Sequence, residues 1–425
     1  MDRRDFLKIS GAGMAGLYLT GLLRAAEGSA SKPNIVMILL DDIGYECFGC
    51  YGCKDYKTPN IDALAAKGVK FDYCYSTPLC TPSRVELMTG RYTHRNYVGF
   101  GVMPPNEITF ANILKDAGYS TCITGKWQLG DDLEGPKKCG FDEYCLWQIN
   151  GLGPRYWKSR IVCNGKVLED IADKYGPDVN SDFALKFMEE NKDKPFLVYY
   201  PMCLTHNPFC PTPESAKGER SDKNDSPEYF SDMVSYADKL VGNLVKKLDE
   251  LGIRDNTLVL FTGDNGTGKV ITTNTEKGKV QGGKATMTDA GTHVPLVASW
   301  PKEIKKPTVC SDIVDFSDFL PTMAEAAGAK IPADRIIDGK SFLPQIKGEK
   351  GNPREWTFLH YWESGRKKEK TREAAWNKKW KLYDDGSLYD LEKDPLEKNP
   401  VAANSPEAEN IRKELLKVFA EVKRK

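Results

Sequence analysis

A cysteine, Cys80, opens the stretch CTPSRVELMTGR, whose residue types are suited to binding an anion. Thr81 is a suitable N-cap, Pro82 fits the first position of a helix, and Gly90 is able to end that helix. The free N–H groups at a helix N-terminus attract anions and lower the pKa of a cysteine, and Arg84 follows one turn later. Taken alone, Cys80 is more often a buried structural cysteine beside an ordinary capped helix.

Two aspartates follow the first strongly apolar segment of the chain. Residues 34–40 (NIVMILL) form a continuous apolar run, which is typical of a strand buried on both faces of a parallel sheet. Asp41 and Asp42 come directly after it, at the carboxyl end, where open α/β sheets bind ligands. Adjacent carboxylates repel each other unless a cation lies between them. The pair indicates a metal site or, equally well, a solvated turn.

A second apolar segment, residues 257–262 (TLVLFT), ends in a similar way. Asp264 and Asn265 follow it and add a carboxylate and an amide oxygen at a strand end. Together with the first pair they make a set of oxygen ligands that suits a hard cation such as Ca²⁺ or Mg²⁺. The chain has four histidines, which disfavours a dinuclear zinc site rich in nitrogen ligands.

Three basic side chains are further candidates. Lys126 follows a strand expected over residues 119–124, His206 follows one expected over 196–202, and Lys284 lies in a polar loop. Each also has an ordinary explanation, because strand-end lysines, loop histidines and loop lysines are commonly exposed to solvent. The chain has no net charge, so an anionic substrate would have to be met by a local group of this kind.

The order Cys-x-Pro-Ser-Arg, followed by Leu-x-Thr-Gly-Arg, resembles the signature of the formylglycine-dependent (type I) sulfatases of the alkaline phosphatase-like superfamily. In that family a maturation enzyme oxidises the cysteine to the aldehyde formylglycine, and the hydrate of the aldehyde is the nucleophile. The resemblance assigns this role to Cys80. It also implies a metal site for Ca²⁺, with Mg²⁺ as the alternative ion, whose ligands are Asp41, Asp42, Cys80, Asp264 and Asn265.

The same resemblance implies that Arg84, Lys126 and Lys284 hold the sulfate group. His206 stands in the family's Thr-His-x-Pro setting. It is expected to contact the ester and, with Lys284, to protonate or stabilise the departing oxygen. With Cys80, these four residues form the expected catalytic set.

Two expected substrate contacts depart from the family pattern. The segment Gly-Lys-Trp-His-Leu-Gly carries Gln128 at the histidine position, and a glutamine exchanges hydrogen bonds but does not titrate. The usual Glu-Gly-Gly-x-Arg is here Asp-Ala-Gly-Thr-His, which ends at His293. The base that removes the last proton in the family reaction is therefore not identified by the resemblance.

Buried strands and helices alternate along the chain, which predicts an α/β fold. We expect a three-layer sandwich with a large mixed, mainly parallel sheet over residues 33–335. Residues 336–425 are expected to form a small C-terminal α/β subdomain with an antiparallel sheet, since Asp384-Asp385-Gly386 separates two strand-like segments. Residues 130–176 show no clear period and are predicted to be loops at the rim of the pocket.

The first 30 residues have the features of a signal peptide of the twin-arginine type. Arg3 and Arg4 precede an apolar run over residues 9–23, which is shorter than the roughly 20 residues that a membrane span needs, and small residues follow. We expect export by the twin-arginine machinery and cleavage of this segment. The mature protein is then expected in the periplasm or outside the cell, without a stable membrane span.

Charge and cysteine content limit the possible partners. Lys and Arg together number 60 and so do Asp and Glu, so nothing global attracts nucleic acid or an anionic membrane. Twelve cysteines are compatible with some disulfides after export. The run Cys47, Cys50, Cys53 lacks the fourth Cys-Pro of a ferredoxin segment and is predicted to be a loop.

These observations predict a hydrolase that releases sulfate from a sulfate ester. A sulfated carbohydrate is the expected substrate, and aromatic residues between Trp147 and Trp157 could stack on sugar rings or simply pack in the rim. A phosphodiester or phosphonate monoester hydrolase of the same fold is the nearest alternative. A non-catalytic binder of sulfated glycans is a second one, suggested by Gln128 and His293.

Overall fold

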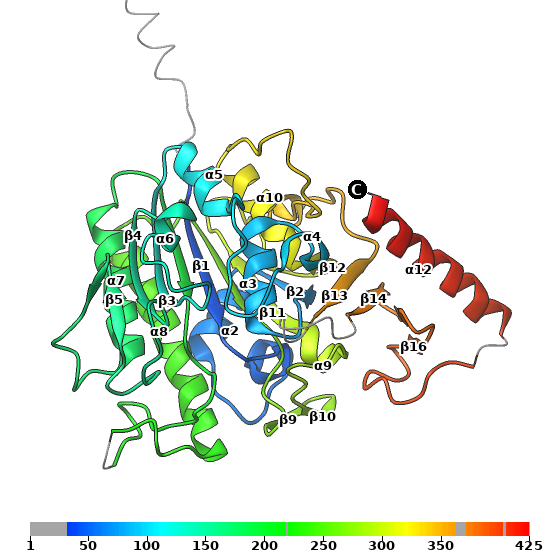
Figure 1. The fold of residues 1–425 in the computed structure, drawn as a ribbon, viewed down its shortest axis with the longest axis horizontal. Helices are drawn as coiled ribbons and strands as arrows, with labels where there is room; N and C mark the ends of the chain where they lie inside the picture. The colour runs from blue at the N-terminus through cyan, green and yellow to red at the C-terminus, as the bar shows by residue number, and fades with distance from the viewer. Residues whose placement is uncertain (1–31, 218–219, 363–370, 403–404, 425) are drawn as a thin grey trace, which may run out of the picture. The chain divides into compact units, whose positions relative to one another are not determined.

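The computed structural model describes residues 32–217, 220–362, 371–402 and 405–424. Residues 33–425 form one compact unit (Figure 1). The export segment predicted over residues 1–30 lies outside the described residues. Within the described part, no helix combines the length and the apolar character that a bilayer span requires.

A ten-stranded mixed sheet is the centre of the fold. Its middle strands β8, β1, β7, β3 and β4 run parallel, while β11 is antiparallel to both β2 and β8. In sheet order the strands are β12 (Thr308–Asp315), β2 (Val69–Tyr75), β11 (His293–Ser299), β8 (Thr257–Gly263), β1 (Asn34–Leu40), β7 (Phe196–Pro201), β3 (Ser120–Lys126), β4 (Glu143–Trp147), β5 (Ile161–Cys163) and β6 (Lys166–Val167). This arrangement confirms the predicted large, mainly parallel sheet.

Strand β1 shows why the sheet is covered on both faces. Ile35, Met37 and Leu39 enter one buried core, and the alternate residues Val36 and Ile38 enter another, because successive side chains of a strand point to opposite faces. Helices α3, α5, α10 and α11 line the first core, and α2, α7 and α8 line the second (Figure 1). The fold is therefore the expected three-layer α/β sandwich.

The long helix α8 lies close to its predicted position, and its apolar stripe is buried as expected. The α-helices of the described residues are α2 (Pro59–Ala66), α3 (Cys80–Thr89), α4 (Thr93–Asn96), α5 (Phe110–Asp116), α6 (Gly135–Lys138), α7 (Gly176–Glu190), α8 (Phe230–Glu250), α9 (Asp289–Thr292), α10 (Phe319–Ala326), α11 (Leu343–Ile346) and α12 (Pro406–Arg424).

The C-terminal part contains the predicted small antiparallel sheet. Its strands are β13 (Thr357–Tyr361), β14 (Arg372–Trp376), β15 (Trp380–Tyr383) and β16 (Leu388–Asp390), and α12 packs against them. Leu343 and Ile346 of α11, in contrast, belong to the core of the large sheet. The small sheet begins at Thr357, in β13. The remaining two strands, β9 (Thr272–Thr275) and β10 (Gly278–Gln281), form a separate hairpin.

Two local predictions are wrong. The segment 130–176, predicted to be loops, contributes β4 and β5 to the large sheet, because the five-residue run of β4 is too short to show a period. Helix α3 begins at Cys80 itself, after Leu79, and no side chain caps it. The hydroxyl of Thr81 instead accepts a hydrogen bond from the N–H of Gly101 at 3.1 Å. Gly90 does end the helix, with a φ of 67°.

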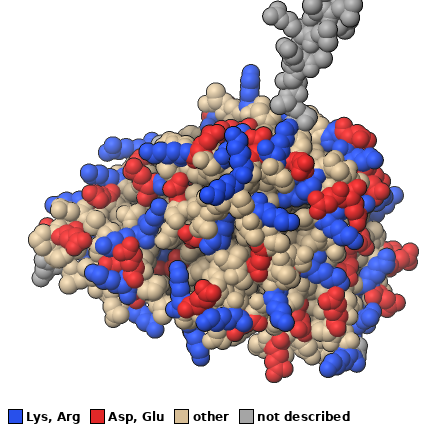
Figure 2. Space-filling model, turned by 180° about the vertical axis from the view of Figure 1, so that it is seen from behind, with Lys and Arg blue, Asp and Glu red and all other residues tan. Residues whose placement is uncertain are grey.

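The surface of the molecule carries charges of both signs. Figure 2 shows positive and negative side chains interspersed over one face of the molecule, as the balanced composition predicts.

All twelve cysteines lie among the described residues, and none of them forms a disulfide.

Candidate active site

The two predicted pairs of oxygen ligands, Asp41 with Asp42 and Asp264 with Asn265, meet at one edge of the large sheet. Strands β1 and β8 are parallel neighbours, with Leu40 opposite Gly263, so the residues that follow each strand come together. The N–H of Asp42 donates to Asp264 Oδ1 at 3.0 Å, and Asn265 Nδ2 donates to Asp42 Oδ1 at 2.9 Å. The structure therefore brings Asp42, Asp264 and Asn265 together at this edge.

Helix α3 presents its first turn to the same carboxylates. Arg84 donates to Asp264 Oδ2 through Nη2 at 2.8 Å and through Nε at 3.1 Å. The ligand atoms of Cys80, Asp41 and Asp264 all lie within 4.8 Å of one another. All four side chains are almost fully buried. Cys80 thus belongs to a buried charged cluster with Asp41, Arg84 and Asp264. Below, the cluster means these residues together with Asp42 and Asn265 and the basic side chains that contact them.

A lysine from a third strand completes the inner part of the cluster. Lys126, at the end of β3, places Nζ 2.7 Å from Asp41 Oδ2, and its side chain is fully buried. A buried lysine is stable only when it is paired, and Asp41 supplies the partner. The alternative of a solvent-exposed strand-end lysine is excluded.

His206 and Lys284 join the cluster through Asp42. His206 Nε2 lies 3.4 Å from Asp42 Oδ2 and 3.1 Å from Lys284 Nζ, and Lys284 also donates directly to Asp42 Oδ2. The Lys284 loop packs closely on α9, since a Cβ built on Gly283 would lie 2.6 Å from the carbonyl carbon of Ala290. Glycine is therefore required beside Lys284 for this close approach.

One member of the cluster was not predicted from the sequence. Arg155, in the loop between β4 and β5, donates through Nη1 to Asp41 Oδ2 at 3.1 Å. Its guanidinium also stacks on Trp147, 4.2 Å from the ring centroid. Nothing in the local sequence distinguishes Arg155 from other loop arginines.

The two residues that depart from the family pattern lie in different environments. Gln128 follows Lys126 closely, is 7% exposed, and its Oε1 has no hydrogen-bond partner among the described residues. His293 uses one ring nitrogen on Asp289, at 3.2 Å, and the other on the carbonyl of Asp72, at 2.8 Å. It stacks on Tyr45, with the ring centroids 4.0 Å apart. Neither ring nitrogen of His293 is left for the expected substrate contact, and no contact joins it to the cluster.

Comparison with known families agrees with this arrangement. The sequence model of the Sulfatase family matches residues 33–329, which include every member of the cluster. The chain belongs to the sulfatase family. A second model, N-sulphoglucosamine sulphohydrolase, C-terminal, matches residues 282–425 of this sulfatase.

Several known proteins are similar to this sulfatase over most of its length. Human arylsulfatase A is 32% identical, covering 80% of this chain and 72% of its own. The N-acetylgalactosamine-6-sulfatase of Canis lupus familiaris is 32% identical, covering 78% and 69%. The solved structure of Ps i-CgsB in complex with k-i-k-neocarrahexaose is 28% identical with a TM-score of 0.79, covering 92% of each chain. The activity that follows is hydrolysis of sulfate esters.

Electrostatics divide the buried acids into two kinds. Burial alone would raise the pKa of Asp41, but Lys126, His206, Arg84 and Arg155 hold it well below its ordinary value. Burial and the neighbouring Asp41 raise the pKa of Asp264 to about 7, despite its bonds to Arg84. His206 and Lys284 likewise lower the pKa of Asp42 against the effect of burial, so the negative charge of the cluster is concentrated on Asp41 and Asp42.

Burial also governs the neutral members of the site. It raises the pKa of the Cys80 thiol, and the surrounding carboxylates raise it further against the effect of Lys126. The lowered pKa expected from the helix N-terminus is therefore wrong. Burial lowers the pKa of His206 to about 4, against the opposing effect of Asp42.

The residues present fit a divalent cation. Asp41 Oδ1 and Asn265 Oδ1 are buried acceptors for which the described residues supply no hydrogen-bond donor, and Arg84 Nη2 lies 3.7 Å from the former. A buried acceptor left unpaired is costly, and a cation relieves this cost. The ligand atoms are mostly oxygens, which suits a hard ion such as Ca²⁺ or Mg²⁺.

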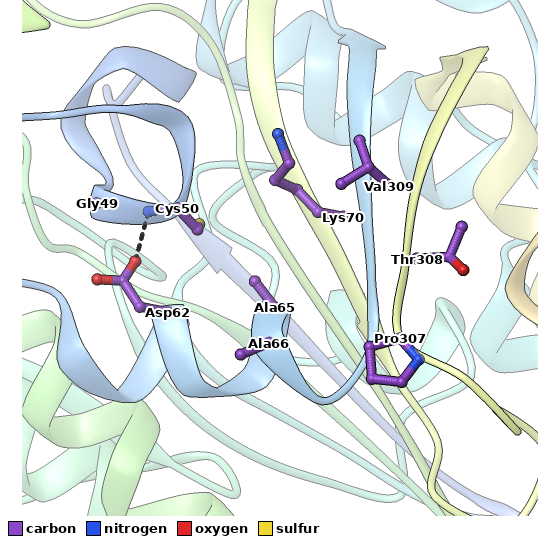
Figure 3. A pocket seen from close by; sticks show the side chains of 9 residues that line it. All are labelled: Gly49, Cys50, Asp62, Ala65, Ala66, Lys70, Pro307, Thr308 and Val309. Carbon is purple, nitrogen blue, oxygen red and sulfur yellow. Dashed lines mark hydrogen bonds between the residues drawn. The ribbon is translucent and has the colours of Figure 1, made fainter. Parts of the chain in front are cut away.

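A separate groove of about 530 Å³ lies beside α2, β2 and β12 (Figure 3). It is lined mainly by small side chains, with Lys70 at one side and Asp62, which accepts the N–H of Cys50 at 2.7 Å. None of the cluster residues lines it. We assign the chemistry to the cluster at the ends of β1, β8 and β3.

Proposed function

We propose that this sulfatase releases sulfate from a sulfated carbohydrate, with Cys80 converted to formylglycine as its nucleophile. The observation that carries the proposal is the position of Cys80, within 4.8 Å of the Asp41 and Asp264 ligand atoms. Arg84 and Lys126 bring positive charge to the same carboxylates. A sulfuryl group that gains negative charge during transfer requires such a concentration of cations.

Conversion of Cys80 needs a maturation enzyme with an oxidant. In the formal balance, the CH₂–SH group loses two protons and two electrons to that oxidant. Water then supplies the aldehyde oxygen, and the sulfur leaves as hydrogen sulfide. Cys80 is 1% exposed in the folded chain, so we propose that the enzyme acts before folding is complete. The resulting aldehyde, as its hydrate, supplies the nucleophilic oxygen for covalent catalysis.

A divalent cation, which we propose to be Ca²⁺ with Mg²⁺ as the alternative, would be held by Asp41, Asp42, Asp264 and Asn265. When bound, such an ion lowers the pKa of a hydroxyl group and offsets charge on the sulfate oxygens. Lys126 and Arg84 flank this position and hold the sulfate. Because both are buried and already paired, they need little reorganisation to do so.

We place His206 and Lys284 at the leaving oxygen. His206 Nδ1 lies 2.6 Å from the carbonyl oxygen of Asn207, which only accepts, so Nδ1 carries the proton. Nε2 then accepts a hydrogen bond from Lys284 Nζ at 3.1 Å. The ammonium of Lys284 is therefore the donor from which the departing oxygen takes its proton, and His206 orients it.

One feature favours a carbohydrate as the alcohol part of the ester. Among the described residues the buried Oε1 of Gln128 has no donor, and sugar hydroxyl groups are donors. Trp147 is 4% exposed and covered by Arg155, so it packs within the rim instead of stacking on a sugar ring. The names of two similar proteins point the same way, one a sulfatase of N-acetylgalactosamine 6-sulfate and one solved with a carrageenan-type oligosaccharide.

We further propose that residues 1–30 direct export by the twin-arginine route, so that the enzyme acts in the periplasm or outside the cell. The paired arginines, the apolar run and the small residues that follow support this proposal.

Release of inorganic sulfate from a substrate panel tests the proposed function. The panel contains 4-nitrophenyl sulfate, sulfated galactose, N-acetylgalactosamine and glucosamine, carrageenan oligosaccharides, and a matched phosphodiester and phosphonate monoester. We expect sulfate release from at least one sugar sulfate by the mature protein and none by C80A. Faster cleavage of the phosphodiester or phosphonate ester, or no turnover by fully modified protein, would overturn the assignment.

A further inference from the structure

Arg155 has more hydrogen-bonding capacity than its contacts within the protein use. Nη1 donates to Asp41, and the guanidinium face lies against Trp147. Among the described residues the Nε and Nη2 donors have no partner, while the side chain is 10% exposed. An arginine that is stacked and paired on one side presents its remaining donors in a fixed direction. These donors are available to an anion that enters from solvent.

The backbone around Arg155 is held in place by a single carboxylate. Asp222 accepts the N–H groups of Arg155 at 2.6 Å, Tyr156 at 3.0 Å and Trp157 at 2.7 Å. The hydroxyl of Tyr156 donates in turn to the carbonyl of Cys203 at 2.8 Å. The loop is thus anchored at several points, which lowers the entropy cost of binding a ligand through Arg155.

The Arg155 loop adjoins the residues that we place at the leaving oxygen. The hydroxyl of Tyr156, the next residue in the chain, donates to the carbonyl of His206 at 2.5 Å as well as to that of Cys203. His206 is the partner of Lys284, which we place at the leaving oxygen. The scissile sulfate already has Arg84 and Lys126 as cationic contacts. Arg155 is therefore a cation beyond the two that we place on the scissile sulfate.

We infer that Arg155 is a specificity-determining residue that binds a second anionic group, a carboxylate or sulfate, on the alcohol part of the substrate. This inference rests on the proposed function, because it takes the leaving alcohol to lie on the His206 side. It narrows the substrate class to sulfated sugars that carry another negative charge near the scissile ester. Simple neutral sugar sulfates would bind without this contact.

Binding is best measured in the C80A background, in which no turnover occurs. The probes are phenyl sulfate and the ortho-, meta- and para-carboxyphenyl sulfates, and dissociation constants are obtained by calorimetry. Arg155→Gln removes the charge and Arg155→Lys keeps it without the planar fork. Arg220→Gln is the matched control, since Arg220 also stacks on a tryptophan, 5.2 Å from the Trp157 ring, but forms no bond to the cluster.

We expect at least one carboxyphenyl sulfate to bind more tightly than phenyl sulfate. R155Q should weaken that binding about tenfold and change the binding of phenyl sulfate less than threefold. R155K should fall between, and R220Q should match the parent. Equal loss for all probes, or no loss for any, would overturn the inference. Because C80A binds without chemistry, failure of the sulfatase assay with this preference retained would count against the proposed function alone.

Discussion

Lys126 Nζ lies 2.7 Å from Asp41 Oδ2, with both side chains fully buried. The two residues stand at the ends of β3 and β1, and β7 lies between these strands in the sheet. The ion pair therefore spans one intervening strand at the edge where the catalytic cluster is built. In the proposed function, the sulfate of the substrate and Asp41 share the charge of this lysine.

Replacing Lys126 by methionine should lower kcat/KM for 4-nitrophenyl sulfate by about 100- to 1000-fold, because a preorganised cation facing the sulfate is lost. Lys381→Met is the control, since Lys381 is also buried and pairs with Glu397 at 3.1 Å in the C-terminal part. K381M should lower the free energy of unfolding by about 3–5 kcal/mol but leave the kcat/KM of folded protein unchanged. Equal kinetic losses in both variants would show that Lys126 acts only through stability.

Lys284→Met should change how the rate depends on the leaving group. Nitrophenolate leaves without a proton, so 4-nitrophenyl sulfate should lose about tenfold or less in kcat/KM, whereas unsubstituted phenyl sulfate should lose about 100-fold or more. The measurement is the slope of log kcat/KM against the pKa of the leaving phenol. Lys279→Met, an exposed lysine of β10, serves as the control. A K284M slope parallel to that of the parent would rule out proton donation by Lys284.

Chelation should abolish activity, and added Ca²⁺ or Mg²⁺ should restore it. A cation that binds the folded state should also raise the stability of the mature protein, by about 2.7 kcal/mol at 100 times its dissociation constant. This gain in stability is measured as the rise in melting temperature, the thermal shift, on adding the cation. Asp41→Asn should remove the thermal shift, whereas Asp62→Asn, in the groove beside α2, should keep it. A shift that persists in D41N would place the cation elsewhere.

The acidic residues of the inner cluster could be predicted because each follows a pattern that is recognisable in the neighbouring sequence. Asp41 and Asp264 each follow an apolar run that ends abruptly, and parallel strands bring their carboxyl ends to one edge. Arg155 could not be predicted in this way. Its position depends on the pairing of β4 with β5 and on Asp222, which is far along the chain.

Tertiary contacts also explain the predictions that were wrong. The pKa of Cys80 is set by burial against distant carboxylates, not by its place in α3. His293 is surrounded by Tyr45, Tyr73 and Tyr75 from other elements, so its ring packs as part of the structure. Neither environment is visible in the neighbouring sequence.

Acid should destabilise the protein through His94, which packs against Phe358 of the C-terminal sheet. Burial, aided by the charge of Arg95, lowers its pKa to about 4, with His360 and the carboxylates of Asp338 and Glu373 also nearby. The unfolded chain binds a proton near pH 6.5 and the folded chain only near 4. Stability is therefore lost as the pH falls through this window, by about 1–2 kcal/mol after allowance for partial exposure.

His94→Gln should flatten this dependence. The free energy of unfolding of the parent and of H94Q is measured by denaturant titration at pH 7 and pH 5. Glu373, whose pKa is lowered to about 2, loses its contribution only at more acidic pH and does not interfere. The same decrease in both proteins would exclude His94 as the cause.

The state of the side chain at position 80 in active enzyme tests the central claim most directly. Peptide mass spectrometry across Cys80 is performed on protein made with and without its maturation enzyme, and sulfate release is assayed on the same samples. We predict that the peptide exchanges two hydrogens and a sulfur for one oxygen, and that activity rises in proportion to the modified fraction. An unmodified thiol in fully active protein, or complete conversion without sulfate release, would contradict the account.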